Sequence, residues 1–181
     1  MIQTIDLSLN CLAGKILPLM EFPMMTALAL SLNRLTGNIP IFDFPMIVSL
    51  DLHQNGLTGI IPNFDMPRLK DMHLNMNDLT MIRPSILLPA LEILDLSDNE
   101  FTSVPKTLNL PKLQVLDLKG NSIDQIPANL CADQEPYLHI LEADEQACAK
   151  SQNNCCSNNH HQASNQKSDI VAFGCIKSIP K

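Results

Sequence analysis

The chain has 181 residues, of which 45% are hydrophobic and 17% charged, a composition that suits one folded domain with a continuous core. Its net charge of -7 disfavours binding to nucleic-acid phosphates or to an anionic membrane surface, because both require clustered Lys and Arg. No apolar run approaches the roughly 20 residues that cross a bilayer, so direct membrane insertion is not expected.

Most of the chain is one pattern repeated six times. The first copy carries one extra residue, and the other full copies keep a 22-residue period. A regular period of this size predicts a solenoid of stacked turns. The expected organisation is therefore six repeats over residues 1–127 and a different segment over residues 128–181. The copies begin at Ile2, Met25, Ile47, Leu69, Leu91 and Leu113.

Each copy opens with alternating apolar residues, as in Leu50 and Leu52, which indicate a short strand with one buried face. Stacked copies would form a parallel sheet. An asparagine follows each strand where the chain turns inward, and its amide can satisfy backbone groups of that turn. We expect these amides to form a buried structural ladder: Asn10, Asn33, Asn55, Asn77, Asn99 and Asn121.

The second part of each copy contains proline, as at Pro40 and Pro45 in the second copy. Proline forbids a regular helix here, and apolar residues such as Phe42 and Phe44 recur two apart. We therefore expect an outer wall of extended and turn segments. Because the chain has 4% aromatic residues, we expect an aliphatic core.

The pattern LxxLDLxxNxLTGxIP, with LTGNIP at 35–40 and LTGIIP at 57–62, resembles the leucine-rich repeat family in a version similar to plant-type extracellular repeats. The resemblance covers residues 2 to about 130. It implies an α/β-type solenoid, a horseshoe with a parallel concave β-sheet and a mostly non-helical convex side of extended, turn and 3-10 segments. It also implies that the concave sheet binds proteins or peptides.

Outward-facing strand positions form the largest ordered surface, so a partner is expected there. Their carboxylates and imidazoles could in principle share a proton or a metal ion, but Asp in this strand is common in the family and a structural or solvated role is favoured. No nucleophile elbow, HExxH or phosphate loop occurs, so no enzyme, cofactor, catalytic residue or metal site is predicted. The candidate partner-binding residues are Asp51, His53, Asp71, His73, Asn75, Ile93, Asp95, Val115 and Asp117.

From residue 128 the rhythm stops, and the segment resembles a cysteine-bearing C-terminal cap, with Leu138, Ile140 and Leu141 supplying one last strand-like layer. Residues 151–168 are polar and indicate a surface loop. A zinc site with His160 and His161 competes with disulfides but lacks the usual ligand spacing. The disulfide candidates are Cys131, Cys148, Cys155, Cys156 and Cys175.

Cys11 stands apart from the other cysteines. Five strand spacings of about 4.8 Å place it roughly 24 Å from the last repeat, beyond the about 7 Å that a disulfide spans between alpha carbons. It is expected to be free or bonded to an N-terminal cap. Since Ile2, Ile5 and Leu7 would form an open apolar edge, we expect a signal and cap to precede Met1, or another subunit to cover this end.

The sequence thus predicts a non-enzymatic protein-recognition or scaffold module that binds a protein or peptide through the concave face. Two alternatives remain open: a structural subunit of a larger assembly or extracellular matrix, and an inhibitor of a secreted hydrolase. The cysteines indicate an extracellular, secreted location or an oxidising organelle lumen.

Overall fold

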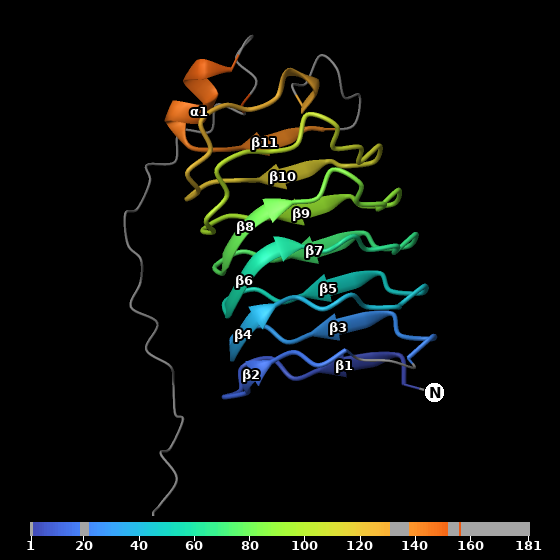
Figure 1. The fold of residues 1–181 in the computed structure, drawn as a ribbon. Helices are drawn as coiled ribbons and strands as arrows, with labels where there is room; N and C mark the ends of the chain where they lie inside the picture. Colours follow the sequence, from blue (N-terminus) through green and yellow to red (C-terminus); the bar gives the residue numbers. More distant parts are fainter. Residues whose placement is uncertain (1, 19–21, 131–137, 152–155, 157–181) are drawn as a thin grey trace, which may run out of the picture.

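The computed structural model describes residues 2–18, 22–130, 138–151 and 156. The described chain is a solenoid whose turns stack along one axis, from β1 at one end to β11 and α1 at the other (Figure 1). Each turn supplies one strand to the same parallel sheet, and the described residues contain little helix. The predicted fold class is confirmed.

The main sheet, here called the concave sheet, has seven strands of three residues each. The middle residue of each interior strand is buried and its two neighbours are partly exposed, as the alternating pattern predicts. Neighbouring turns pair in register, with Leu50 opposite both Leu28 and Met72. In order the strands are β1 (Thr4–Asp6), β3 (Ala27–Ala29), β5 (Ser49–Asp51), β7 (Asp71–His73), β9 (Ile93–Asp95), β10 (Val115–Asp117) and β11 (Ile140–Glu142).

The last of these strands comes from the segment after the repeats. Val115 pairs with Ile140 and Leu116 with Leu141 in parallel register, and Leu138 is buried. The predicted final layer is therefore confirmed. It extends the concave sheet by one strand beyond the six repeats.

A second parallel sheet, which the sequence reading did not predict, runs along the other side of the first four turns. Its strands are β2 (Ala13–Lys15), β4 (Arg34–Asn38), β6 (Gly56–Ile61) and β8 (Asp78–Ile82). Gly37 and Gly59 lie in it at φ +78° and +80°, and a Cβ on Gly59 would come within 2.7 Å of the Asn38 side chain. The glycine of the LTGxIP motif is thus required by the backbone of this sheet.

The pairing of β6 with β8 shifts register between Gly59 and Ile60. At the repeat position of Gly59, β8 carries Met81, and β8 is the last strand of this sheet in the described chain. In the next two copies the proline follows the asparagine by six residues instead of seven, as in Asn99 to Pro105 compared with Asn77 to Pro84. The shorter segment and the proline, which cannot donate a hydrogen bond, leave less backbone for pairing.

The capped end contains a 3-10 helix, η1 (Ala128–Leu130), and one short α-helix, α1 (Glu145–Lys150). The core runs through the stack between the two sides and is mostly Leu, Ile and Met. The prediction of a wholly aliphatic core is wrong, because Phe42, Phe44, Phe64 and Phe101 are also buried. The Phe42 ring lies 5.1 Å from that of Phe44 and 6.0 Å from that of Phe64, centroid to centroid, so stacking between turns fills the outer wall.

The first turn has no neighbour on its outer side among the described residues. Ile2 is 51% exposed and Leu7 45%, whereas the equivalent Leu52 is fully buried. Among the described residues, no helix has both the length and the apolar character that a membrane span requires.

Candidate functional site

All nine predicted partner-binding residues lie on the concave sheet or two residues beyond the end of one of its strands. The pairing register aligns their side chains into columns that run across the strands. One column is Asp71, Ile93, Val115 and Ile140; the next is Asp51, His73, Asp95, Asp117 and Glu142. His53 and Asn75 follow β5 and β7 in a third column. The structure therefore brings the predicted residues together on one continuous surface.

The aspartates of the second column also have a local structural role. Oδ1 of Asp51 accepts a hydrogen bond from the N–H of His53 at 3.1 Å, Asp95 from Ser97 at 3.0 Å, and Asp117 from Lys119 at 2.9 Å. Each carboxylate thereby satisfies the N–H two residues later, where the strand ends. This contact gives the frequent LDL motif a physical reason. It also leaves the other carboxylate oxygen available.

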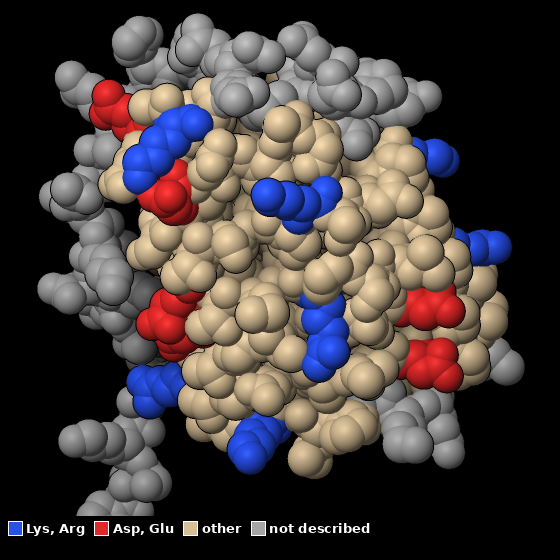
Figure 2. All heavy atoms as spheres, turned by 45° about the horizontal axis from the view of Figure 1, so that its top comes forward, with Lys and Arg blue, Asp and Glu red and all other residues tan. Residues whose placement is uncertain are grey.

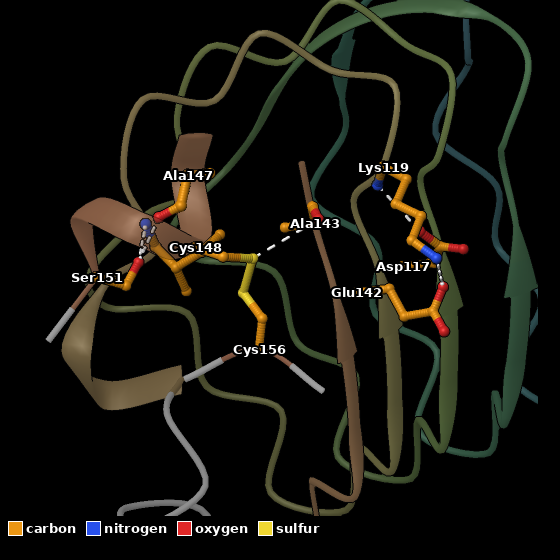
Figure 3. Close-up of a disulfide and its surroundings, with 9 residues drawn as sticks. Asp117, Lys119, Glu142, Ala143, Ala147, Cys148, Ser151 and Cys156 are labelled. Atoms are coloured by element: carbon orange, nitrogen blue, oxygen red, sulfur yellow. Dashed lines mark hydrogen bonds and ion pairs between the residues drawn. A yellow bond between two sulfur atoms is a disulfide. The ribbon is translucent and has the colours of Figure 1, made fainter. Parts of the chain in front are cut away.

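A hydrogen bond within one turn and an ion pair between two strands lie on the same surface. Nδ1 of His53 lies 2.7 Å from Oδ1 of Asp51, and Nζ of Lys119 contacts Oε2 of Glu142 on the neighbouring strand (Figure 3). Glu142 raises the pKa of Lys119 by accepting this hydrogen bond. The sequence places Ile140 in a last strand-like layer, but neither Ile140 nor Glu142 is among the predicted binding residues. The register of that layer with Val115 and Asp117 was the signal that could have added them.

Asp117 lies among carboxylates, with Asp95 and Glu142 on the adjoining strands and Lys119 beside it in its own turn (Figure 3). Burial raises its pKa to about 6, opposed by the hydrogen bond from Lys119 N–H and increased further by repulsion from Asp95 and Glu142. This carboxylate therefore gains or loses its charge close to neutral pH.

The asparagine side chains form hydrogen bonds that link each turn to the preceding one. Nδ2 of Asn77 donates to Leu74 O at 3.0 Å and to Leu52 O of the preceding turn at 3.1 Å, while its Oδ1 accepts from Leu57 N at 3.0 Å. The same contacts recur at Asn33, Asn55, Asn99 and Asn121. Asn77 and Asn99 are buried, at 6% and 8% exposure, whereas Asn10 is exposed and bonds only within its own turn among the described residues.

The residue before each asparagine has a left-handed backbone. Leu9, Leu32, Gln54, Met76 and Asp98 have φ between 52° and 56°, and Gly120 has φ 67°. Non-glycine residues in this region carry about 1 kcal/mol of strain each, which the surrounding ladder must offset. This conformation turns the chain inward after each strand. The asparagine amide then reaches backbone carbonyls of its own turn and of the preceding turn.

The cysteine predictions fall into two groups. Cys148 on α1 is bonded to Cys156 (Figure 3), while Cys131, Cys155 and Cys175 lie outside the described residues. Cys11 is itself disulfide-bonded, so the prediction that it could be a free thiol is wrong. The described part of the chain holds no group of three His, Cys, Asp or Glu suited to a metal ion, and His160 and His161 lie outside that part.

This repeat geometry matches that of a known protein family. Family models described as leucine rich repeat match residues 46–65 and 67–123. The chain is a leucine-rich repeat protein. A comparison with curated proteins found no match.

Among solved structures, this leucine-rich repeat protein is similar to the plant peptide hormone receptor RGFR1 in complex with RGF2, with 28% identity, a TM-score of 0.69 and 79% of this chain covered. It is also similar to the Arabidopsis receptor kinase HAESA in complex with the peptide hormone IDA and the co-receptor SERK1, with 28% identity, a TM-score of 0.68 and 78% covered. The chain spans 24% and 25% of the lengths of those two chains. A pollen receptor kinase 3 matches at 26% identity and a TM-score of 0.53, covering 67% of this chain and 62% of its own.

The C-terminal end of the repeat protein is a cysteine-bearing cap. Both oxygens of Asp144 accept hydrogen bonds from the last turn, from Gly120 N and Asn121 N at 3.1 Å each. In the interior, a backbone carbonyl of the next turn fills this role, as Gln54 O does for Asn33 N. The Asp144 side chain therefore replaces the backbone acceptor that a further turn would supply. The Cys148–Cys156 disulfide links α1 to the residues that follow it.

Proposed function

We propose that this leucine-rich repeat protein is a non-enzymatic recognition module that binds a peptide or an extended protein segment on its concave sheet. The observation that carries the proposal is the in-register surface of partly exposed side chains across seven strands. On this surface the His73 side chain forms no hydrogen bond or ion pair with other described residues, and Ile93 is partly exposed. The fold therefore leaves them available to a partner.

The comparisons support the same proposal. Two of the similar structures are receptors in complex with peptide hormones, and they share about 28% of residues with this chain. The disulfide-bonded cysteines support an extracellular location, as does the similarity to the ectodomain of a plant membrane receptor kinase. The proposed binding residues are the nine named from the sequence, and the proposed domain organisation is six repeats over residues 1–127 followed by the cap segment.

A blocking substitution tests the site without knowledge of the partner. Random 12-residue peptides displayed on phage are selected against the immobilised chain, and the enriched peptides are synthesised. Their dissociation constants are then measured for wild type and for His73→Trp, which places an indole at the centre of the concave sheet. We expect His73→Trp to weaken binding at least about tenfold, because an extended peptide can no longer lie flat on the strands.

The matched control is Asp65→Trp, which adds the same bulk at an exposed position of the outer wall. We expect this variant to bind like wild type. If His73→Trp binds normally and Asp65→Trp does not, the binding surface is the outer wall and the proposal is wrong. Failure to enrich any peptide also counts against it.

A further inference from the structure

The two columns of the concave sheet change along the stack. In the first three strands one column holds the small residues Thr4, Ala27 and Ser49, and in the other Ala29 separates Asp6 from Asp51. Toward the cap, β9, β10 and β11 present two parallel columns. One is apolar, Ile93, Val115 and Ile140; the other is acidic, Asp95, Asp117 and Glu142.

The acidic column is only partly neutralised. Lys119 pairs with Glu142, but no Lys, Arg or His of the described chain forms an ion pair with Asp95 or Asp117. One oxygen of Asp95 accepts both the N–H and the hydroxyl of Ser97, at 3.0 and 2.7 Å, which fixes the carboxylate with its other oxygen unbonded among the described residues. Two oriented carboxylates on strands about 4.8 Å apart repel each other, and a cation between them would relieve that repulsion.

The apolar column lies two residues along the strands from the acidic one, which is about 6.6 Å. Ile140 is 38% exposed, and Ile93 and Val115 are partly exposed, although branched aliphatic side chains are usually buried. The face drawn in Figure 2, by contrast, is mostly uncharged, with acidic and basic side chains scattered over it. The concave columns therefore combine charge and apolar area in a way that points to a specific partner chemistry.

We propose that these two columns bind an extended peptide segment in which basic and aliphatic residues alternate. Successive side chains of an extended peptide point to opposite sides. A segment that runs across the strands between the columns therefore directs Lys or Arg to Asp95 and Asp117 and aliphatic residues to Ile93, Val115 and Ile140. The three strands span about 10 Å, so a basic-aliphatic-basic triplet fits there, with its two cations at Asp95 and Asp117 and its aliphatic side chain on the apolar column. This inference rests on the proposed function and specifies its partner.

The test uses a defined probe, a fluorescent peptide with the core Val-Lys-Ile-Lys-Val between Gly-Ser flanks. Fluorescence anisotropy measures its dissociation constant at low salt, alongside a Val-Glu-Ile-Glu-Val peptide and a Lys-Lys-Val-Ile-Val peptide of the same composition. We expect the alternating basic peptide to bind at least about tenfold more tightly than either, and its affinity to fall as salt screens the carboxylates.

Matched variants locate the contact. Asp95→Asn with Asp117→Asn should weaken binding of the basic peptide about tenfold or more, while Asp43→Asn with Asp65→Asn, which removes two exposed outer-wall charges, should leave it unchanged. Circular dichroism confirms that both double variants are folded. Affinity should also rise between pH 5 and pH 7.5, as Asp117 ionises beside Asp95, Glu142 and Lys119 on a face that also carries His53 and His73.

The outcomes separate this inference from the proposed function. If selected peptides depend on an unblocked His73 but show no basic residues, concave binding stands and the partner chemistry is wrong. Equal binding of the three peptides, or a basic peptide insensitive to the Asp95 and Asp117 changes, also overturns the inference. Binding weaker than about 1 mM at low salt overturns it as well.

Discussion

The first and third turns of the solenoid carry the same sequence pattern but differ in what that pattern contributes. Leu7 and Leu52 occupy the same position, yet Leu7 is 45% exposed and Leu52 is fully buried. Asn10 and Asn77 of the fourth turn occupy the same ladder position, yet only the Asn77 side chain bonds to a preceding turn, through Leu52 O and Leu57 N. The stabilising effect of a repeat residue therefore depends on its neighbours, as expected for a stack in which each turn contacts only the adjacent ones.

The largest effect should come from truncating the buried leucine. Leu52→Ala removes a fully buried side chain and leaves a cavity, which should lower the free energy of unfolding by about 3–4 kcal/mol. Leu7→Ala should cost less than about 1 kcal/mol, because half of that side chain already contacts water. Urea denaturation followed by circular dichroism measures both. Equal losses would show that the first turn is as well packed as the third.

The ladder asparagines should show a smaller difference of the same kind. Asn77→Ala leaves Leu57 N and the carbonyls of Leu52 and Leu74 without their partner in a buried site, at a cost of about 2–3 kcal/mol. Asn10→Ala should cost about 0.5 kcal/mol, since water can replace its exposed bonds. The same urea denaturation experiment measures the free energy of unfolding of both variants. An equal loss in the two would contradict the view that the stabilising effect of a ladder asparagine depends on its neighbouring turns.

The capped end gives a third contrast with the open first turn. Asp144→Ala removes the acceptor of two backbone N–H groups, so we expect a loss of about 1–2 kcal/mol. Asp124→Ala is the control, because it removes a nearby carboxylate whose ion pair with Lys150 is exposed and should change little. Comparable losses in the two variants would mean that Asp144 does not serve as the terminal acceptor of the ladder.

The smallest effect concerns charge inside the concave sheet. The pKa of Asp117 is raised from 3.8 to about 6, so native wild type loses stability as pH rises from about 4 through about 6. Asp117→Asn keeps the acceptor for Lys119 N–H but cannot ionise. After allowance for solvent screening, the variant should be about 1 kcal/mol more stable than wild type at pH 8 and equal to it near pH 3.5.

Melting temperatures at the two pH values check this, with an expected gain of about 2–4 °C at pH 8 for a chain of this size. A variant that is less stable than wild type at pH 8 would show that ionised Asp117 stabilises the sheet.

The sequence alone was sufficient to predict the solenoid, because Leu and Asn recur at a regular 22-residue period and each turn packs only against the adjacent turns. It also placed the nine concave residues, since alternation along a strand decides which side chains face outward. Even the added strand β11 was signalled by the spacing of Leu138 and Leu141.

Other features were decided by contacts between turns that no single repeat contains. The second sheet depends on lateral pairing of segments whose alternation is weak, and the buried Phe42–Phe64 stack depends on which side chains meet across two turns. Glu142 lies on the concave face because β11, which comes from the segment after the repeats, pairs in register with β10. Periodicity specifies the turn, but only packing between turns specifies which neighbours each residue acquires, and therefore its burial, pKa and charge environment.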